Sequence, residues 1–284
     1  MNSTSSTSTS EQSRNNKYLS VYGVVDRFFP LPVSAPSSDP IELELSTGGP
    51  IAAVYSWVDP GDFDGLEADI SEGGRLAKLA RRHDGVVRAL AGSGTVLPVR
   101  LGTLFPDAVS LTELLDQTAD DLLVELDRVR GCHEWDVRIH LHQSAADLPI
   151  TPANESGTAY LMRRRNERQQ AVAAQAAIST AISAADEVLT VLAESVVELA
   201  IDGSGTAMSR GYLVRTQHAA EFETVAAELT YELEGHGGNV RISGPLPPYS
   251  FVKIRLERLS QWLKPQKAPW CDLRSGGLST LLTA

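Results

Sequence analysis

The sequence predicts an α+β protein of two domains, and three stretches of the chain lead to this fold class. In the first half, alternating apolar segments stand beside two amphipathic helices, a pattern typical of a sheet covered by helices. In the middle, residues 159–200 contain no Gly and no Pro and are rich in Ala, the best helix former. After them, a strand, a helix and a strand form half of a ferredoxin-like unit. A length of 284 residues fits one or two such domains.

Periodicity and end signals place the elements of the first half. Strands are expected at 18–25, 41–46, 51–58, 96–99 and 134–141, the second and third joined as a hairpin at Gly48-Gly49. One helix begins at Ser71 or Glu72 and runs to about Ala91. Another spans 111–129, with Ser110 as its cap and Gly131 as its stop. We expect both helices on one side of a sheet that strand 134–141 closes.

The long helix predicted at 159–200 carries a regular apolar seam. Its members repeat every three or four residues: Ile178, Ile182, Ala185, Leu189, Leu192, Val196 and Leu199. This period belongs to a helix packed along another helix. At 1.5 Å per residue the helix is roughly 60 Å long, more than one small domain covers. Ordinary burial of the seam is the favoured interpretation, and binding of a partner by the seam is the alternative.

The remaining segments set the domain limits. Residues 143–155 are polar and contain Pro149 and Pro152, which marks a boundary. Beyond the long helix we expect a strand at 208–214, a helix at 219–234 and a strand at 239–243. The predicted parts are a disordered tail at 1–16, an N-terminal domain at 17–143, a C-terminal domain at 144–263 and a loosely ordered tail at 264–284.

Composition excludes several classes of protein. A formal net charge of -11 argues against a nucleic-acid-binding surface over the whole chain. No run of about 18 apolar residues occurs, so we expect no membrane span, and the polar first residues do not form a signal peptide. The two cysteines, Cys132 and Cys271, are far apart and form no disulfide framework, which favours a cytoplasmic protein.

Two clusters of ionisable residues are candidate sites. Cys132, His133, His140 and His142 fall in one short span, but without a Cys-x-x-Cys pair surface histidines are favoured over a metal site. The second cluster lies at the start of the long helix and consists of Arg163, Arg164, Arg165 and Arg168. Cations are unfavourable at this end of the helix dipole. A solvated face is the favoured interpretation, and docking to an acidic partner or to the chain's own acidic domain is the alternative.

Four stretches, in order, carry a family resemblance. They are Tyr22-Gly23-Val24-Val25; Leu97-Pro98-Val99-Arg100-Leu101-Gly102-Thr103-Leu104-Phe105 with Glu134-Trp135-Asp136-Val137-Arg138 after it; Ser156-Gly157-Thr158-Ala159-Tyr160-Leu161; and Gly244-Pro245-Leu246-Pro247-Pro248-Tyr249-Ser250-Phe251-Val252. Together they resemble the gas vesicle protein family called GvpL/GvpF, over about residues 18–252. The last stretch is the most specific. The chain departs from the family pattern at Leu101, where Phe is usual, and at Leu246, where Trp is usual.

The resemblance implies a ferredoxin-like N-terminal α+β domain, and a C-terminal domain that joins the long helix to a small ferredoxin-like β-α-β part. It implies a gas vesicle accessory protein, a minor shell component or assembly factor that binds the hydrophobic major shell protein and other accessory proteins. No catalytic residue, cofactor or metal carries over. The family-motif residues are Pro98, Arg100, Gly102, Trp135, Tyr160, Gly244, Pro245, Pro247, Pro248, Tyr249 and Phe251.

Roles within the fold are expected for several of these residues. The Arg100 guanidinium is expected to tie a strand end to backbone carbonyls or to an acid. Tyr249 and Phe251 are expected to pack on a neighbouring helix rather than to contact a partner. Two other functions stay open as alternatives, an enzyme with a small-molecule site between the domains and, least favoured, nucleic-acid binding by the arginine cluster.

Overall fold

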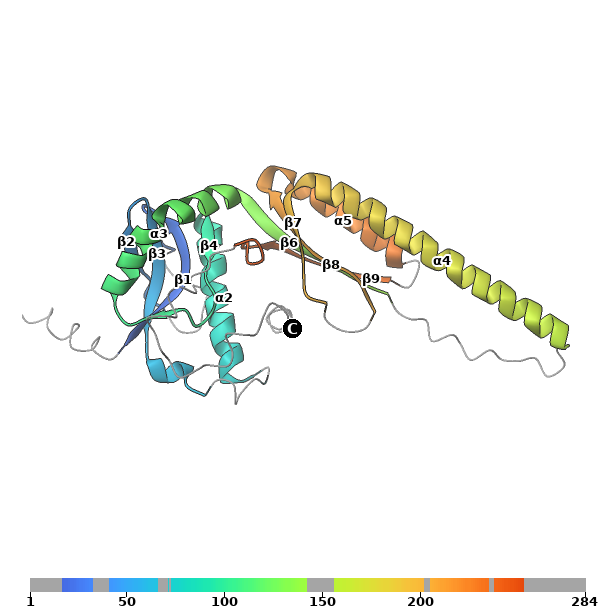
Figure 1. Ribbon diagram of the computed structural model, residues 1–284, viewed down its shortest axis with the longest axis horizontal. Helices are drawn as coiled ribbons and strands as arrows, with labels where there is room; N and C mark the ends of the chain where they lie inside the picture. The colour runs from blue at the N-terminus through green and yellow to red at the C-terminus, as the bar shows by residue number, and fades with distance from the viewer. Residues whose placement is uncertain are drawn as a thin grey trace, which may run out of the picture. The chain divides into compact units, whose positions relative to one another are not determined.

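A computed structural model describes residues 17–32, 41–65, 71, 73–141, 156–201, 205–234 and 238–252 (Figure 1). The chain forms two compact units, one of Met1–Cys132 with Leu246–Ala284 and one of His133–Pro245. Both predicted tails, 1–16 and 264–284, lie outside the described residues, as do 142–155. The boundary therefore falls before the predicted strand 134–141 and not after it at 143, and the chain returns to the first unit at Leu246.

The first unit is built on an antiparallel sheet. Its strands are β1 (Tyr18–Asp26), β2 (Glu44–Gly48), β3 (Ile51–Val58), β4 (Val96–Pro98) and β5 (Leu104–Phe105). They follow the order β2-β3-β1-β4, with β5 also paired to β1. The predicted hairpin is confirmed, and Gly49 takes the positive φ of 55° that its tight turn requires. Strand β5 is too short to leave a periodic signal in the sequence.

The two helices of this unit, α2 (Arg75–Ser93) and α3 (Ala108–Val129), cover opposite faces of the sheet. On one face, Val54 and Leu45 pack with residues of α2 such as Val87. On the other, the Ser46 hydroxyl bonds to Thr112 of α3 at 2.9 Å. Neighbouring strand residues point to opposite faces, so the helices cannot share one. The predicted one-sided arrangement is wrong because β1 and β3 are apolar on both faces and need two covers.

Two further expectations for this unit are corrected. The element order β-β-β-α-β-β-α, with a helix on each face, is not ferredoxin-like. The cap of α3 is Asp107 and not Ser110, because the Asp107 carboxylate accepts a hydrogen bond from the Ser110 backbone N–H at 2.7 Å. A 3₁₀ turn, η1 (Pro60–Phe63), follows β3.

The second unit is the ferredoxin-like one. Its elements are β6 (Cys132–Leu141), α4 (Gly157–Leu192), β7 (Ala193–Glu198), β8 (Thr206–Arg215), η3 (Thr216–His218), α5 (Ala219–Glu234) and β9 (Gly238–Leu246). The sheet order β7-β8-β6-β9 and the succession β-α-β-β-α-β complete this fold. The predicted β-α-β part was therefore half of it. The missing pieces were β6, assigned to the first domain, and β7, included in the long helix.

Helix α4 ends at Leu192, and the prediction of helix to residue 200 is wrong there. Residues 193–198 pair with β8, and Val196 lies opposite Tyr212. Two ion pairs across the strands secure this pairing, Arg215 with Glu194 at 2.6 Å and Arg210 with Glu198 at 2.9 Å. The three- and four-residue spacing of the seam continues through Val196, so periodicity could not show the change from helix to strand. Cross-strand pairing decided it instead.

Within α4 the seam is buried against the second unit's own core. Ile178 and Leu189 are buried, and Ile182, Ala185 and Leu192 pack on the same cluster. That cluster contains Trp135, Val137 and Ile139 from β6 and Phe222, Ala226 and Leu229 from α5. Ordinary burial, the favoured interpretation, is thus what the structure shows for this part of the seam.

Candidate interaction surface

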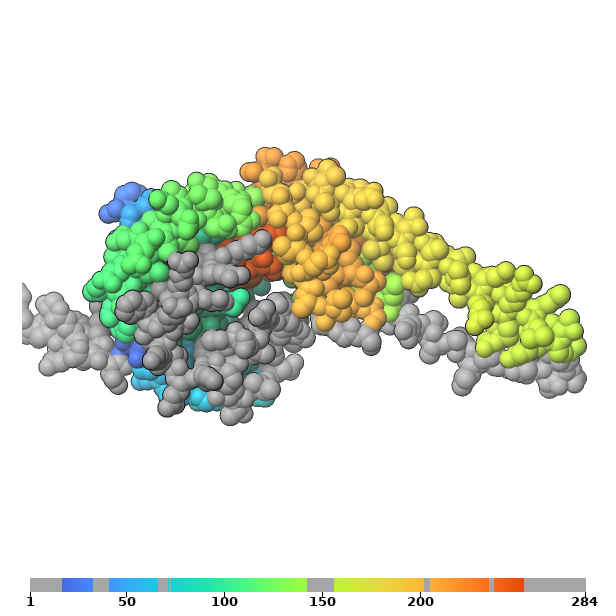
Figure 2. Space-filling model, viewed as in Figure 1, coloured from blue at the N-terminus to red at the C-terminus, as the bar shows by residue number. Residues whose placement is uncertain are grey.

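The N-terminal part of α4, residues 157–177, is an arm that no other described element covers. None of its residues is buried, whereas the seam begins immediately after it at Ile178. At 1.5 Å per residue the arm is about 30 Å long and continues past the end of α5 (Figures 1 and 2). Its first turn is capped by the Ser156 hydroxyl, which accepts a hydrogen bond from the Ala159 N–H at 3.3 Å. Most helical stability in proteins comes from tertiary packing, which no other described element gives this part of α4.

The predicted arginine cluster lies on this arm. Arg163 and Arg164 both pair with Glu167, at 2.7 and 3.3 Å, and hydrogen bonding from Arg163 lowers the pKa of that carboxyl. The Arg163 guanidinium also sits 5.4 Å from the ring centre of Tyr160, a family-motif residue. Arg165 and Arg168 are exposed and make no hydrogen bond or ion pair with any described residue. Two of the four cations are therefore available to a partner.

The Pro-rich stretch at residues 244–252, the most specific of the four motif stretches, has a structural role. Residues 247–252 form a turn in which the Phe251 and Val252 amides bond to the Pro248 carbonyl at 3.3 and 3.2 Å. The Tyr249 hydroxyl donates to Asp84 of α2 at 2.6 Å. Phe251 is fully buried, and its carbonyl accepts from Arg128 of α3 at 2.5 Å. Both aromatic residues thus join helices of the first unit, as the sequence favours.

The start of the same stretch packs within the second unit. A Cβ added at Gly244 would lie 2.4 Å from Cε3 of Trp135, closer than atoms can approach. Trp135 is buried and its ring contacts that of Phe222, with centres 5.6 Å apart. Pro245 follows through a cis peptide bond. Gly244 and Trp135 therefore form one packing site, although they lie at opposite ends of this unit's sequence.

The remaining motif residues, Pro98, Arg100 and Gly102, shape the link between β4 and β5. Pro98 is buried opposite Gly23 of β1, and Gly102 has a φ of 84°, which favours glycine. The expected tie by the Arg100 guanidinium is not observed, because that side chain is exposed and bonds to no described residue. It is the Arg100 carbonyl that holds the turn, accepting from Thr103 N at 3.2 Å and Oγ1 at 2.8 Å.

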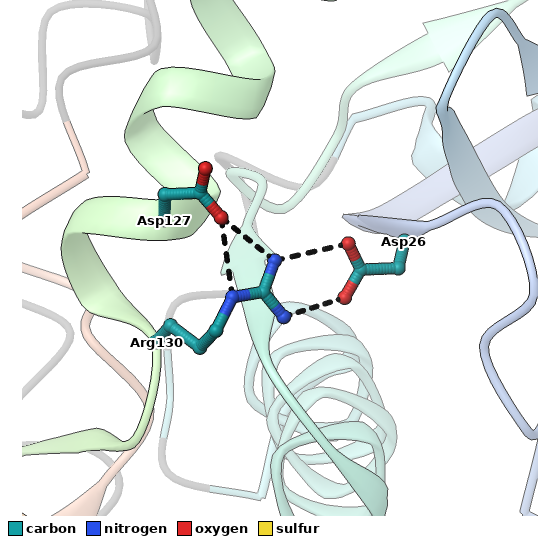
Figure 3. Close-up of polar contacts among 3 residues, drawn as sticks. All are labelled: Asp26, Asp127 and Arg130. Carbon is teal, nitrogen blue, oxygen red and sulfur yellow. Dashed lines mark hydrogen bonds and ion pairs between the residues drawn. The ribbon is translucent and has the colours of Figure 1, made fainter.

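An ion-pair cluster that the sequence did not reveal lies in the first unit (Figure 3). Arg130 bonds to both oxygens of Asp26, at 2.9 and 3.1 Å, and to Asp127 at 2.9 Å. These bonds raise the pKa of the guanidinium. Asp26 and Arg130 line an open hollow of about 510 Å³ together with Phe28 and Phe29. Asp26 and Arg130 at its rim are paired to one another, which suits a structural clasp. A separation of 104 residues hid the pairing.

The histidine span contains no metal site in the described part of the chain. No group of three or more His, Cys, Asp or Glu side chains among those residues could hold a metal ion. The His140 ring instead bonds to the Thr206 hydroxyl at 3.2 Å, and burial lowers the pKa of His133. His142 lies outside the described residues. Across the described residues, no helix has both the length and the apolar character needed to cross a membrane.

Together these features define a class of protein. The ferredoxin-like second unit has a helical arm that no other described element covers, and within the first unit the Pro-rich turn bonds to helix α2. The family-motif residues lie in packing contacts, in turns and on the exposed surface of α4. The chain is thus a two-unit α+β protein with one exposed helical surface.

Comparisons with known proteins identify the family. The profile of the family described as gas vesicle synthesis protein GvpL/GvpF matches residues 18–253, so the chain belongs to that family. It is 32% identical to gas vesicle protein L of Streptomyces sp. (strain CB03234), over 74% of this chain and 82% of that protein. It is 29% identical to gas vesicle protein F of the same organism, over 60% and 76% of the two chains.

Solved structures agree in fold. The crystal structure of gas vesicle protein GvpF from Anabaena sp. PCC7120 aligns with a TM-score of 0.59 at 16% identity, covering 84% of this chain and 97% of that one. GvpF from Microcystis aeruginosa aligns with the same TM-score at 17% identity, covering 84% and 99%. The mixed α+β fold with antiparallel sheets is therefore shared. The family is one of gas vesicle proteins.

Proposed function

We propose that this chain is an accessory factor of gas vesicle formation that binds the hydrophobic major shell protein, as an assembly factor or minor shell component. Membership of the gas vesicle protein family supports a role in gas vesicle formation. A shell protein that faces gas on one side presents much apolar surface before assembly, and such surface aggregates unless it is covered. Binding to other gas vesicle accessory proteins belongs to the same proposal.

The observation that carries this proposal is the distribution of exposed apolar side chains. Eleven large apolar residues are exposed among the described residues, and six of them lie on α4: Tyr160, Leu161, Met162, Val172, Val188 and Val191. The sheet of the first unit is a poorer surface for this contact, because a helix covers each of its faces. The long helix is therefore the better binding surface.

One side of α4 suits this contact best. At 100° per residue, Met162 and Val191 fall on the side turned away from the buried seam, and the exposed Val188 lies at the edge of that side. Apolar contact is little affected by moderate salt, whereas exposed ion pairs weaken as the screening length shortens to about 3 Å at 1 M. The proposed contact should therefore be resistant to salt.

Pull-down of the purified shell protein by the full chain tests the proposal. Binding should survive 1 M salt and fall at least about tenfold in the variant Met162→Asp/Val188→Asp/Val191→Asp. A matched control places three aspartates on exposed positions of α5, with Ala220→Asp, Thr224→Asp and Ala227→Asp, and should bind normally. Binding that is lost in moderate salt, or on neutralising Arg163, Arg164, Arg165 and Arg168 alone, would assign the contact to the arginine cluster instead.

A further inference from the structure

A second face of the arm has a pattern that the shell-protein contact does not use. Leu161, Arg165, Arg168 and Val172 are spaced by four, three and four residues and so form one stripe along the helix. The two apolar ends are 68% and 65% exposed, and the two arginines between them have no described partner. Between residues 157 and 177 the chain has four arginines and a single acid, although its net charge is -11. The arm is thus a cationic rod on an anionic protein.

Helix α3 of the first unit presents the opposite pattern on its solvent side. Val109, Glu113, Asp116, Asp120 and Val124 form one stripe, and every member is exposed. The two valines at its ends are each 66% exposed. The three acids between them form no hydrogen bond or ion pair with any described residue. An apolar–acidic–apolar stripe therefore stands on one helix and an apolar–basic–apolar stripe on the other.

We propose that the arm of one copy docks on the α3 stripe of a second copy of this chain. Antiparallel packing places Leu161 beside Val124, Arg165 beside Asp120 and Arg168 beside Asp116, and it brings Val172 beside Glu113, one helical turn from Val109. The helix dipoles favour the same orientation. Contact between two arms is disfavoured, because the arginines of one arm would face those of the other. This inference goes beyond the proposed function and needs no shell protein.

The competing acidic helix fits less well. Helix α5 has five exposed acids and no cation, but its exposed large apolar residue is the single Tyr231. It therefore has one exposed large apolar residue beside its acids, where α3 has Val109 and Val124 at the two ends of its acidic stripe. Of the two acidic helices, α3 is the one that complements the arm both in its charges and in its exposed apolar residues.

The proposed contact has a defined symmetry and strength. The two surfaces differ, so the association is heterologous and can continue into rings or open chains rather than stop at a dimer. One helix face against another is small beside the roughly 1,200–2,000 Å² of stable interfaces, so the association is weak and depends on concentration. Screening of its ion pairs also makes it sensitive to salt.

Sedimentation velocity of the full purified chain tests this, at about 100 μM and with salt raised from ~0.02 to ~0.5 M. The wild type should form species larger than the monomer at low salt and lose them at high salt. Arg165→Glu/Arg168→Glu and Asp116→Arg/Asp120→Arg should each be monomeric throughout. Mixing the two variants should restore association, because an acidic arm then meets a basic α3 and a basic arm meets an acidic α3.

The matched control is Glu228→Arg/Glu232→Arg on α5, which should associate like the wild type. Circular dichroism verifies that each variant is folded. A monomeric wild type at low salt overturns the proposal, as does a mixture that fails to associate. Loss of association in the α5 variant but not in the α3 variant assigns the contact to α5 and also overturns it. None of these measurements involves the shell protein, so they are independent of the proposed function.

Discussion

The two parts of helix α4 have similar helix-forming sequences and opposite surroundings. From Ile178 to Leu192 the helix has a buried seam in the core of the second unit, whereas from 157 to 177 no residue is buried. Both parts are rich in Ala and free of Pro, so propensity treats them alike. What separates them is the presence of α5 beside one part only (Figure 1). Residues 178–192 contribute to the stability of the fold, and residues 157–177 provide exposed surface.

The sharpest test of this contrast places a charge in each part. Leu189→Asp buries an unpaired carboxylate at a fully buried position and should lower the free energy of unfolding by at least about 3 kcal/mol. Val172→Asp, on the exposed arm, should change it by less than about 0.5 kcal/mol. Urea denaturation followed by circular dichroism measures both. Equal stability of the two variants would show that the seam does not hold the second unit together.

A smaller loss of stability is expected on changing Gly244, the motif glycine that packs against the core of the second unit. Gly244→Ala places a methyl group 2.4 Å from Trp135 and should lower the stability by about 1–3 kcal/mol. Gly157→Ala, at the start of the arm, meets no atom within 4 Å and should leave the stability equal or raise it by up to about 1 kcal/mol. Thermal denaturation of the pair decides whether Gly244 is required by packing. A tolerated alanine there would mean that Trp135 can move aside.

A pH effect is expected in the first unit, where His83 is buried. Its Nε2 lies 2.8 Å from the Val99 carbonyl, Nδ1 has no acceptor, and burial lowers its pKa from the ordinary value of 6.5. The unfolded chain therefore binds the proton first as pH falls, and stability is lost below about pH 6.5. The loss is at most about 1.4 kcal/mol per pH unit.

Unfolding measured between pH 7.5 and 5.5 checks this expectation. His83→Gln should remove that part of the slope, since an amide can still donate to Val99 and takes up no proton in this range. His218→Gln, at a partly exposed histidine, serves as the control and should keep the slope. An unchanged slope in His83→Gln would show that other groups cause the pH dependence.

The subtlest difference between the two parts of α4 should appear in hydrogen exchange. Amides of 157–177 belong to residues that no other described element buries and should exchange by local fraying, well before those of 178–192. Mass spectrometry of peptides from each part measures the difference at low chain concentration and low salt. At high concentration, docking of the arm on a second copy should slow exchange in 157–177. Arg165→Glu/Arg168→Glu should abolish that slowing.

Much of the fold was open to prediction, and the errors share a cause. Helix 219–234 and the hairpin of β2 and β3 were confirmed, because each has a local period and clear ends. The assignment of 193–200 to the helix was wrong because Val196 and Leu199 fit the seam spacing, while the strand forms by pairing with β8. The one-sided placement of α2 and α3 was wrong as well. A strand that is apolar on both faces does not specify which helix covers which.

The features of the candidate surface also fall into those that the sequence predicted and those that it could not. The sequence alone showed the arginine cluster, the Pro-rich stretch and the seam, because each is contiguous or periodic. It could not show that Arg165 and Arg168 are left without a described partner, or that Arg130 is held by Asp26. Pairing between distant residues depends on where the chain returns, and sequence spacing does not encode that position.

Taken by itself, the sequence determined the helix propensity of 157–192, the acidic net charge with a basic local stretch, and the Gly-Pro-x-Pro-Pro-Tyr motif. These are properties of composition and local period, which fix what a segment can form. Only the tertiary structure decided that α4 stops at Leu192, that β6 opens the second unit, and that no other described element covers the arm. Burial and strand pairing are satisfied by contacts far along the chain, and their free energy outweighs local preference wherever the two disagree.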